Sequence, residues 1–286
     1  VFKGSGNIIK GNHIGHDGTE SLISSDESII DMNAGNTLDG NVIAGNANIL
    51  MNFGSSDASG NTVINNHFGY LPWNNSSMGS SSAGIKLVEA ENNEFSGNVI
   101  KFNNTNDQEA AIFVLDANDN TFYSNTISNN TGHGIHFSGS STGNQFGAIN
   151  SGNIVHDNSG WGVNFLVNTA TGNPVSSNQI YDNTLGSIGN YTNINPIDTP
   201  TLLAAYLNSS SDSIIIRHTD ISENTSASYL VDVFSNDSEP TLPQGQTLLA
   251  SGITVDSSAL SLGRIAFPYT GNASGYVSST FTDDRQ

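Results

Sequence analysis

Apolar residues occur along the first two thirds of the chain in short pieces, each bounded by Asn, Gly or Ser. Within the pieces, apolar and polar positions alternate, as in Gly84-Ile-Lys-Leu-Val88. A period of two is typical of β-strands. Gly and Asn interrupt every window long enough for a helix. The pattern therefore predicts many short strands and no helices.

The pieces recur in one phrase, Asn-x-apolar-x-x-Asn-x-apolar, of which Asn93–Ile100 and Asn120–Ile127 are clear copies. Successive copies begin about 24 to 32 residues apart, a period typical of solenoid repeats. With three short strands per repeat, stacking predicts a parallel β-helix of about seven coils over residues 1–195. Right-handed winding is expected from the chirality of parallel crossovers.

Alignment of the copies places asparagines in columns along the predicted solenoid. Asn tolerates the left-handed backbone of a sharp corner, and stacked amides hydrogen-bond as a ladder. The ladder columns are Asn36, Asn61, Asn93, Asn120, Asn144 and Asn173; Asn41, Asn66, Asn98, Asn125, Asn153 and Asn178, preceded by Asn12; and a partial one of Asn46, Asn103, Asn130, Asn158 and Asn183. The predicted inward columns are Ile49, Ile85, Ile112, Ile135 and Val163, and Met51, Leu87, Val114, Phe137 and Phe165.

The pattern changes after Pro196 and Pro200, where the Asn phrase stops and longer alternating strands begin. We expect residues 196–200 to be a linker and residues 201–286 to form a small antiparallel β-sandwich. The six expected strands are Leu202–Leu207, Ser213–His218, Tyr229–Phe234, Thr247–Val255, Arg264–Tyr269 and Tyr276–Thr282. The fold class is all-β.

Two stretches of the repeat, Gly11-Asn-His-Ile-Gly15 and Gly40–Asn46, resemble the bacterial right-handed parallel β-helix repeat proteins. The resemblance covers roughly residues 1–190 and implies the fold. The repeats are shared by lyases, epimerases, adhesins and scaffolds, so no activity follows. Val233–Asn236, Gln244–Leu248 and Thr280–Asp283 resemble an immunoglobulin-like module that often follows such β-helices in secreted bacterial proteins. This resemblance implies a secreted or cell-surface location and a module that lacks its last strand.

Charge and composition exclude several classes of binding partner and site. Seven basic and 26 acidic residues give a net charge of −19, which repels phosphate backbones and anionic lipid headgroups. Nucleic acid is therefore excluded as a partner. Membrane insertion is excluded because no stretch approaches the about 20 apolar residues of a span. The absence of Cys rules out disulfides and thiolate metal sites.

The best candidate catalytic pair is Glu89 and Asp116, which follow the third strand of adjacent coils. Stacking places their backbones about 4.8 Å apart. That spacing is near the roughly 5–5.5 Å carboxyl separation of retaining glycosidases, and it also suits a shared calcium ion, the one cofactor that the sequence suggests. The alternative interpretation is two solvated turn acids.

Two further groups are candidates for ligand binding. Asp157 and Asp182 stack beside a corner, with Trp161 shortly after, which is a combination suited to sugars. Corner acids and a packed Trp are the alternative. Tyr70 and Trp73 lie on the longest excursion from a coil, where they either stack on a sugar ring or cover the side of the helix.

Basic residues are scarce in the predicted β-helix, which contains four Lys and no Arg. A lyase or epimerase acting on uronic acids needs cations to neutralise the substrate carboxylate. Histidine offers little, because His13 and His67 share an outward column two coils apart without a third ligand. These observations weaken the enzyme hypothesis.

Three functions remain open. The main prediction is a non-enzymatic extracellular or cell-surface scaffold, adhesin or filament subunit built on a β-helix shaft. It implies head-to-tail or strand-exchange contacts with another copy, or with a longer parent polypeptide, at Val1, Phe2, Asp283 and Asp284, since the repeat is at full strength by Asn7. The alternative is a polysaccharide-active enzyme or glycan-binding protein that uses the carboxylate face. The third is a trimeric phage or viral receptor-binding spike.

Overall fold

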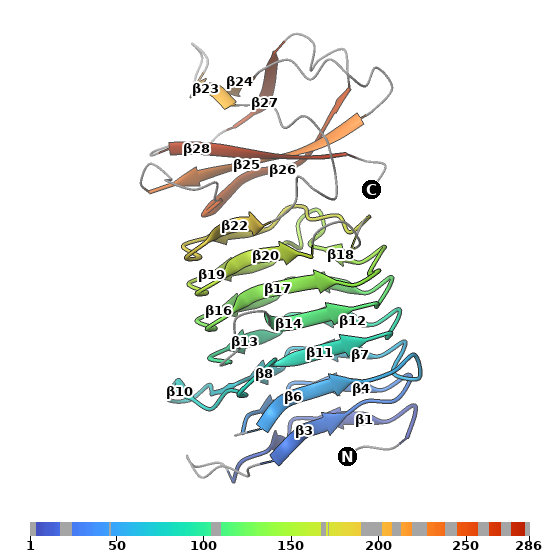
Figure 1. Cartoon of the computed structure of the whole chain (residues 1–286). Helices are drawn as coiled ribbons and strands as arrows, with labels where there is room; N and C mark the ends of the chain where they lie inside the picture. Colours follow the sequence, from blue (N-terminus) through green and yellow to red (C-terminus); the bar gives the residue numbers. More distant parts are fainter. Residues whose placement is uncertain are drawn as a thin grey trace.

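The computed structural model describes residues 4–17, 25–45, 47–103, 110–166, 170, 172–189, 202–207, 213–218, 228–237, 245–256, 263–269 and 276–283. Its first part is a solenoid whose coils stack along one axis, and its last part consists of antiparallel sheets beyond the final coil (Figure 1). The predicted all-β class, a parallel β-helix followed by small antiparallel sheets, is confirmed. The predicted linker 196–200 lies outside the described residues, so the domain boundary stays a prediction.

Three parallel sheets run the length of the solenoid. The first sheet is β1 (Ile8–Lys10), β4 (Thr37–Asp39), β7 (Thr62–Ile64), β12 (Glu94–Ser96), β15 (Thr121–Tyr123) and β18 (Gln145–Phe146). The second sheet is β2 (His13–Ile14), β5 (Val42–Ile43), β8 (His67–Phe68), β13 (Val99–Lys101), β16 (Thr126–Ser128), β19 (Ile154–His156) and β21 (Gln179–Tyr181). The third sheet is β3 (Ser25–Asp31), β6 (Ala47–Phe53), β11 (Ile85–Val88), β14 (Ala110–Leu115), β17 (His133–Ser138), β20 (Trp161–Phe165) and β22 (Gly186–Gly189). Each of the first six coils therefore contributes one short strand to each sheet, as the phrase predicts; the seventh contributes β21 and β22, and joins the first sheet only through a bridge between Phe146 and Val175.

The core lies between the three sheets and follows the alternation. In β11, Ile85 and Leu87 are buried while the residues after them are half-buried. Ile85 pairs with Ile112 and Leu87 with Val114 in the next coil, as predicted. One register prediction is wrong: Ile85 pairs with Met51 rather than Ile49 in the preceding coil. A shift of two residues keeps every apolar side chain on the same face, so the pattern does not distinguish the two registers.

The asparagine ladders are confirmed by hydrogen bonds. In the middle column, Asn98 Nδ2 donates to Asn125 Oδ1 at 3.0 Å and to the Val63 carbonyl at 2.8 Å. Asn98 Oδ1 accepts the backbone N–H and the side-chain amide of Asn66, at 2.9 and 3.1 Å. The same pattern joins Asn61 to Asn93 in the first column, and the third column repeats it from Asn103 to Asn183. Asn46 lies outside the described residues.

The ladder asparagines do not adopt the left-handed conformation that the sequence predicts for them. The residue immediately before the corner asparagine does at most corners: φ is 57° at Asn92, 55° at Ser124 and 54° at Asp157, whereas Gly152 before Asn153 is an exception. The physical reason is that two successive residues share the corner. The chain bends at the outward residue, which has the left-handed backbone, and the asparagine that follows points inward and donates its own N–H to the ladder.

The C-terminal part contains two three-stranded antiparallel sheets. One is β23 (Leu202–Leu207), β24 (Ser213–His218) and β27 (Arg264–Pro268). The other is β26 (Thr247–Asp256), β25 (Ser228–Asn236) and β28 (Tyr276–Asp283). Ile216 and Phe267 from one sheet share a buried cluster with Val231, Val233 and Val255 from the other. All six predicted strands are therefore present, and we call them the antiparallel module.

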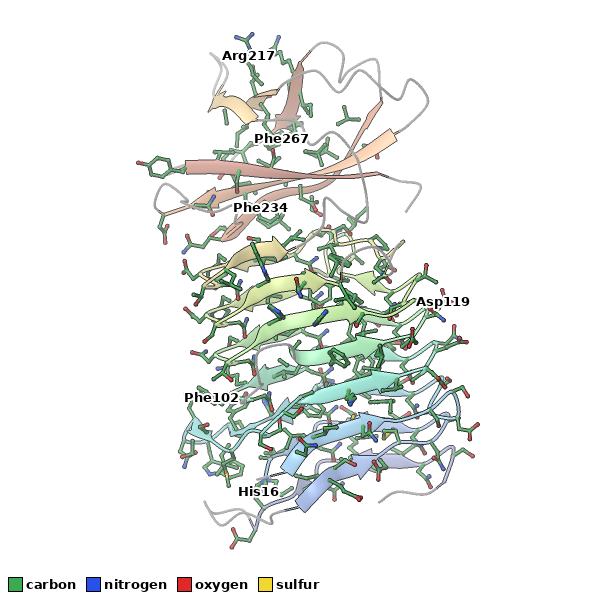
Figure 2. The ribbon with its side chains drawn as sticks, in the orientation of Figure 1. His16, Phe102, Asp119, Arg217, Phe234 and Phe267 are labelled. Carbon is green, nitrogen blue, oxygen red and sulfur yellow. The ribbon has the colours of Figure 1, made fainter. Side chains whose placement is uncertain are left out.

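The antiparallel module is bonded to the last coil. At earlier corners of the second ladder, the N–H before the asparagine donates to a carbonyl of the next coil, as Asn65 does to Ser96 at 2.9 Å. Ser177 occupies this position in the last coil, and its N–H donates instead to Oδ2 of the buried Asp232 in β25, at 2.5 Å. The Gly245 N–H donates to the Ile180 carbonyl at 2.7 Å. Figure 2 shows Phe234 on the side of the module near this coil and Phe267 farther from it.

Among the described residues, no helix is long and apolar enough to cross a membrane. Of the residues expected at assembly contacts, Val1, Phe2 and Asp284 lie outside the described part, and Asp283 is the last residue of β28. The assembly contacts therefore stay a prediction.

Candidate functional site

The predicted catalytic carboxylates lie on adjacent coils at the same corner. Val88 pairs with Leu115, so Glu89 and Asp116 each follow the paired ends of β11 and β14. Both are exposed, and both have left-handed backbones, with φ of 55° and 49°. The Glu89 N–H donates to the Leu115 carbonyl at 3.0 Å. The structure therefore places the pair in equivalent positions, as the sequence predicts.

Asp116 already has a bonding partner at this corner. Its Oδ1 accepts the Ser140 N–H of the next coil at 2.7 Å, which closes the turn that follows β17. Lys86, on the same coil as Glu89, lies over the Phe113 ring with 5.9 Å between Nζ and the ring centroid. The lysine is thus engaged with an aromatic side chain of the third sheet. In the part of the chain that the structure describes, no group of three or more His, Asp or Glu side chains is arranged to hold a metal ion.

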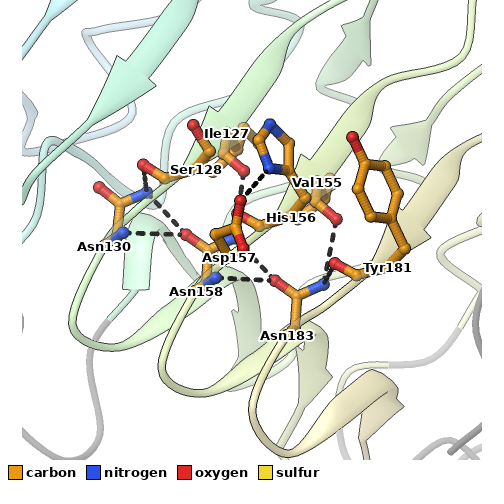
Figure 3. Close-up of polar contacts among 9 residues, drawn as sticks. All are labelled: Ile127, Ser128, Asn130, Val155, His156, Asp157, Asn158, Tyr181 and Asn183. Carbon is orange, nitrogen blue, oxygen red and sulfur yellow. Dashed lines mark hydrogen bonds and ion pairs between the residues drawn. The ribbon is translucent and has the colours of Figure 1, made fainter. Parts of the chain in front are cut away.

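The second candidate group lies at the corner after β19 and β21. Asp157 and Asp182 precede the ladder residues Asn158 and Asn183 and have φ of 54° and 51°. Figure 3 shows His156 beside Asp157, with a 2.6 Å hydrogen bond from Nδ1 to Oδ2. The rings of His156 and Tyr181 are stacked, 5.1 Å apart and within 4° of parallel.

Electrostatics at this corner follow from burial and the two acids. Partial burial raises the pKa of the Tyr181 hydroxyl, and the charges of Asp157 and Asp182 raise it further. The phenol is therefore a hydrogen-bond donor over the physiological pH range. The group combines an oriented imidazole, two exposed carboxylates and an aromatic ring on one corner.

Trp161, predicted to complete this group, belongs to β20 of the third sheet. Its backbone N–H donates to His133 Nδ1 at 2.9 Å. Burial, and then the neighbouring His136, lower the pKa of His133 to about 4, so this imidazole is neutral and suited to accept the bond. The predicted combination of Trp161 with Asp157 and Asp182 is therefore divided between two sheets.

The excursion with Tyr70 and Trp73 forms a hairpin of β9 (Tyr70–Leu71) and β10 (Ser76–Ser77). Tyr70 is buried, and its hydroxyl lies 2.6 Å from His67 Nδ1. Trp73 is 49% exposed and stacks on His13, with 5.0 Å between ring centroids. The structure thus directs Tyr70 against the side of the coil and leaves only Trp73 available to a ligand.

The repeat predicts that His13 and His67 share one outward column, but not that His16 joins them around this hairpin. The signal was present in the spacing of His13 and His16 and in the aromatic residues of the excursion. Their contacts depend on how the hairpin folds back, which the repeat does not encode.

Comparison with known proteins agrees with the architecture. The family described as "right handed beta helix region" matches residues 69–202. That match and the stacked coils support a right-handed β-helix repeat protein. No curated protein matches the chain.

Two solved structures are similar at low identity. Tailspike protein 2 of bacteriophage CBA120, in its enzymatically active domain, is 11% identical with a TM-score of 0.36; the match covers 96% of this chain and 53% of that one. The full-length tailspike protein 2 from Escherichia coli O157:H7 bacteriophage CAB120 is 13% identical with a TM-score of 0.36, and the match covers 96% and 48%. This chain therefore spans about half the length of either.

Proposed function

We propose that this chain is a non-enzymatic structural protein of the cell surface or extracellular space. In this proposal the β-helix is a rigid shaft, and the antiparallel module is an immunoglobulin-like unit fixed to one end of it. Assembly with another copy or a longer polypeptide through Val1, Phe2, Asp283 and Asp284 belongs to the same proposal.

The observation that carries the proposal is the continuity of hydrogen bonding from the coils into the module. The second ladder passes from Asn12 to Asn178. At its end Asp232 replaces the carbonyl that a further coil would supply to Ser177. A buried carboxylate bonded across a junction resists displacement, because breaking the bond removes the Ser177 N–H from Oδ2. These features favour a load-bearing shaft.

The candidate catalytic corner also supports a structural role. Asp116 closes a turn, and Lys86 faces Phe113 rather than the two carboxylates. A structural role accounts for the Asp116 bond, because it ties the corner after β14 to the turn after β17 in the next coil.

Small-angle X-ray scattering of the whole chain tests the shaft. A rigid shaft with a fixed module gives the scattering of one elongated body, unchanged between low and high salt. Two bodies that reorient independently would contradict the proposal. Light scattering on the same sample tests the spike hypothesis, which requires a trimer.

Incubation with a panel of neutral and acidic polysaccharides tests the absence of catalysis. We expect no new reducing ends or unsaturated products from the wild-type protein. Cleavage that is lost in the Glu89→Gln, Asp116→Asn double variant and retained in Asp57→Asn, an exposed acid on another coil, would overturn the proposal in favour of a polysaccharide-active enzyme.

A further inference from the structure

The hairpin β9–β10 lies on the outer face of the second sheet and returns to the coil at Met78 (Figure 1). The Met78 N–H donates to the Gly69 carbonyl at 2.8 Å, and the Gly45 N–H donates to the Met78 carbonyl at 3.0 Å. The hairpin is therefore held at its base by backbone bonds. Its outer part is held by side chains.

An apolar cluster separate from the main core lies under the hairpin. It consists of Val42 and Ala44 from the coil and Leu71 and Met78 from the hairpin, all buried. Val42 neighbours the core residue Ile43 along β5, so its side chain points away from the core. Without the hairpin this outward patch would face water.

Two histidines of the first coil contact the tip of the hairpin. The His13 ring stacks on Trp73 at 5.0 Å and on His16 at 5.1 Å. The His16 ring, which is buried, also lies 5.9 Å from Trp73. The indole thus rests on a pair of adjacent imidazoles.

A third histidine, His67, contacts the base of the hairpin; it lies two coils after His13 in the second sheet. His67 Nδ1 lies 2.6 Å from the Tyr70 hydroxyl, and the two rings meet edge to face. Lys101 Nζ is 5.1 Å above the same Tyr70 ring. A neutral His67 accepts the phenolic hydrogen, whereas a protonated one adds a second positive charge next to Lys101.

Burial and nearby positive charge oppose protonation of His16 and His67. The hairpin Tyr70–Ser77 contains no Asp, Glu, Lys or Arg that would neutralise an imidazolium. Burial, and then Lys101, lower the pKa of His67. Burial, and then His13, lower the pKa of His16, while Asp17 and a hydrogen bond from the imidazole to the Val42 backbone act in the opposite direction.

We propose that the hairpin Tyr70–Ser77 is an acid-sensitive lid, closed over the outward patch of Val42 and Ala44 while His16 and His67 are neutral. An imidazole whose pKa is lower in the closed state than in the released state binds fewer protons when closed. The closed state is therefore fully favoured above the free value near 6.5 and loses stability as the pH falls below it. Each unit of difference in pKa contributes up to about tenfold to the opening constant.

Amide hydrogen exchange on the whole chain, corrected for the intrinsic effect of pH, tests the lid. We expect protection of the Met78 and Gly45 amides to fall by about tenfold or more between about pH 7.5 and about pH 5. The amide of Leu87 in the core strand β11 should keep its protection. Unchanged protection of Met78 and Gly45 would overturn the proposal.

Variants identify the groups responsible. The His16→Gln, His67→Gln double variant keeps polar side chains that do not titrate, and we expect it to lose most of the pH response. Lys101→Met removes the charge beside His67, so the response should weaken while that imidazole remains. His156→Gln is the matched control, because His156 lies in the second sheet several coils beyond the hairpin, and it should retain the full response. An undiminished response in Lys101→Met and in any double variant that folds would contradict the lid.

Discussion

At the scale of single residues, each ladder asparagine both donates and accepts hydrogen bonds between coils. Asn98 accepts two bonds from Asn66 and donates one each to Asn125 and Val63, all within the buried interior. Its identity at a fixed interval made the ladder predictable from the sequence. The backbone conformation at the corner was not predictable, because Gly, Asn, Ser and Asp all occupy the preceding position.

Asn98→Ala should therefore lower the free energy of unfolding by about 2–4 kcal/mol, because it leaves the buried Asn66 N–H without an acceptor. Asn12→Ala is the matched control, since Asn12 belongs to the same ladder but is exposed. There we expect a loss of about 1 kcal/mol or less. Urea unfolding followed by circular dichroism measures both. Equal losses would show that the ladder bonds contribute little.

At the scale of the strand and its corner, spacing between coils limits which residues fit. Gly69 follows β8 with φ of 83°, and a Cβ there would collide with the Lys101 carbonyl of the next coil. Gly60 has a similar φ of 68° but open space around it. In the sequence, Gly is one of the residues that bound the apolar pieces, whereas only the packed coils distinguish a glycine required by its neighbours from one required by its backbone alone.

Gly69→Ala should destabilise the protein by more than about 3 kcal/mol, because the carbonyl it meets is part of a paired coil and has no room to move. Gly60→Ala should cost about 1–2 kcal/mol from the left-handed backbone alone. Thermal and urea unfolding of the two variants give the free energy lost in each, and the difference between them is the cost of the steric collision at Gly69. A Gly60→Ala effect as large as that of Gly69→Ala would remove the distinction.

At the scale of the whole molecule, hydrogen bonds at the junction connect the last coil of the β-helix to the antiparallel module. Asp232 accepts the N–H groups of Ser177 and Gly252, the latter at 2.9 Å, and Ser177 Oγ lies 2.5 Å from Ser251 Oγ. The change of pattern after Pro200 predicted two parts. It carried no sign that an aspartate of the second part would complete the last coil of the first.

Asp232→Ala should uncouple the antiparallel module from the last coil, since both Ser177 and Gly252 lose their acceptor. We expect at least about tenfold faster hydrogen exchange at the Ser177 and Gly252 amides and a separate unfolding transition for the module. Asp237→Ala, at an exposed position in the same module, is the control and should leave both unchanged. Unaltered exchange in Asp232→Ala would show that other contacts hold the junction.

The sequence by itself determined the strands, the stacking and the ladders, because alternation and a repeated phrase report local geometry that every coil shares. It placed Glu89 beside Asp116 and Asp157 beside Asp182 for the same reason. The tertiary structure alone decided what those acids bond to, the register of β6 on β11, the histidine contacts of the hairpin and the junction at Asp232. These depend on single contacts between segments far apart in the chain, and a period of two or of one coil contains no information about them.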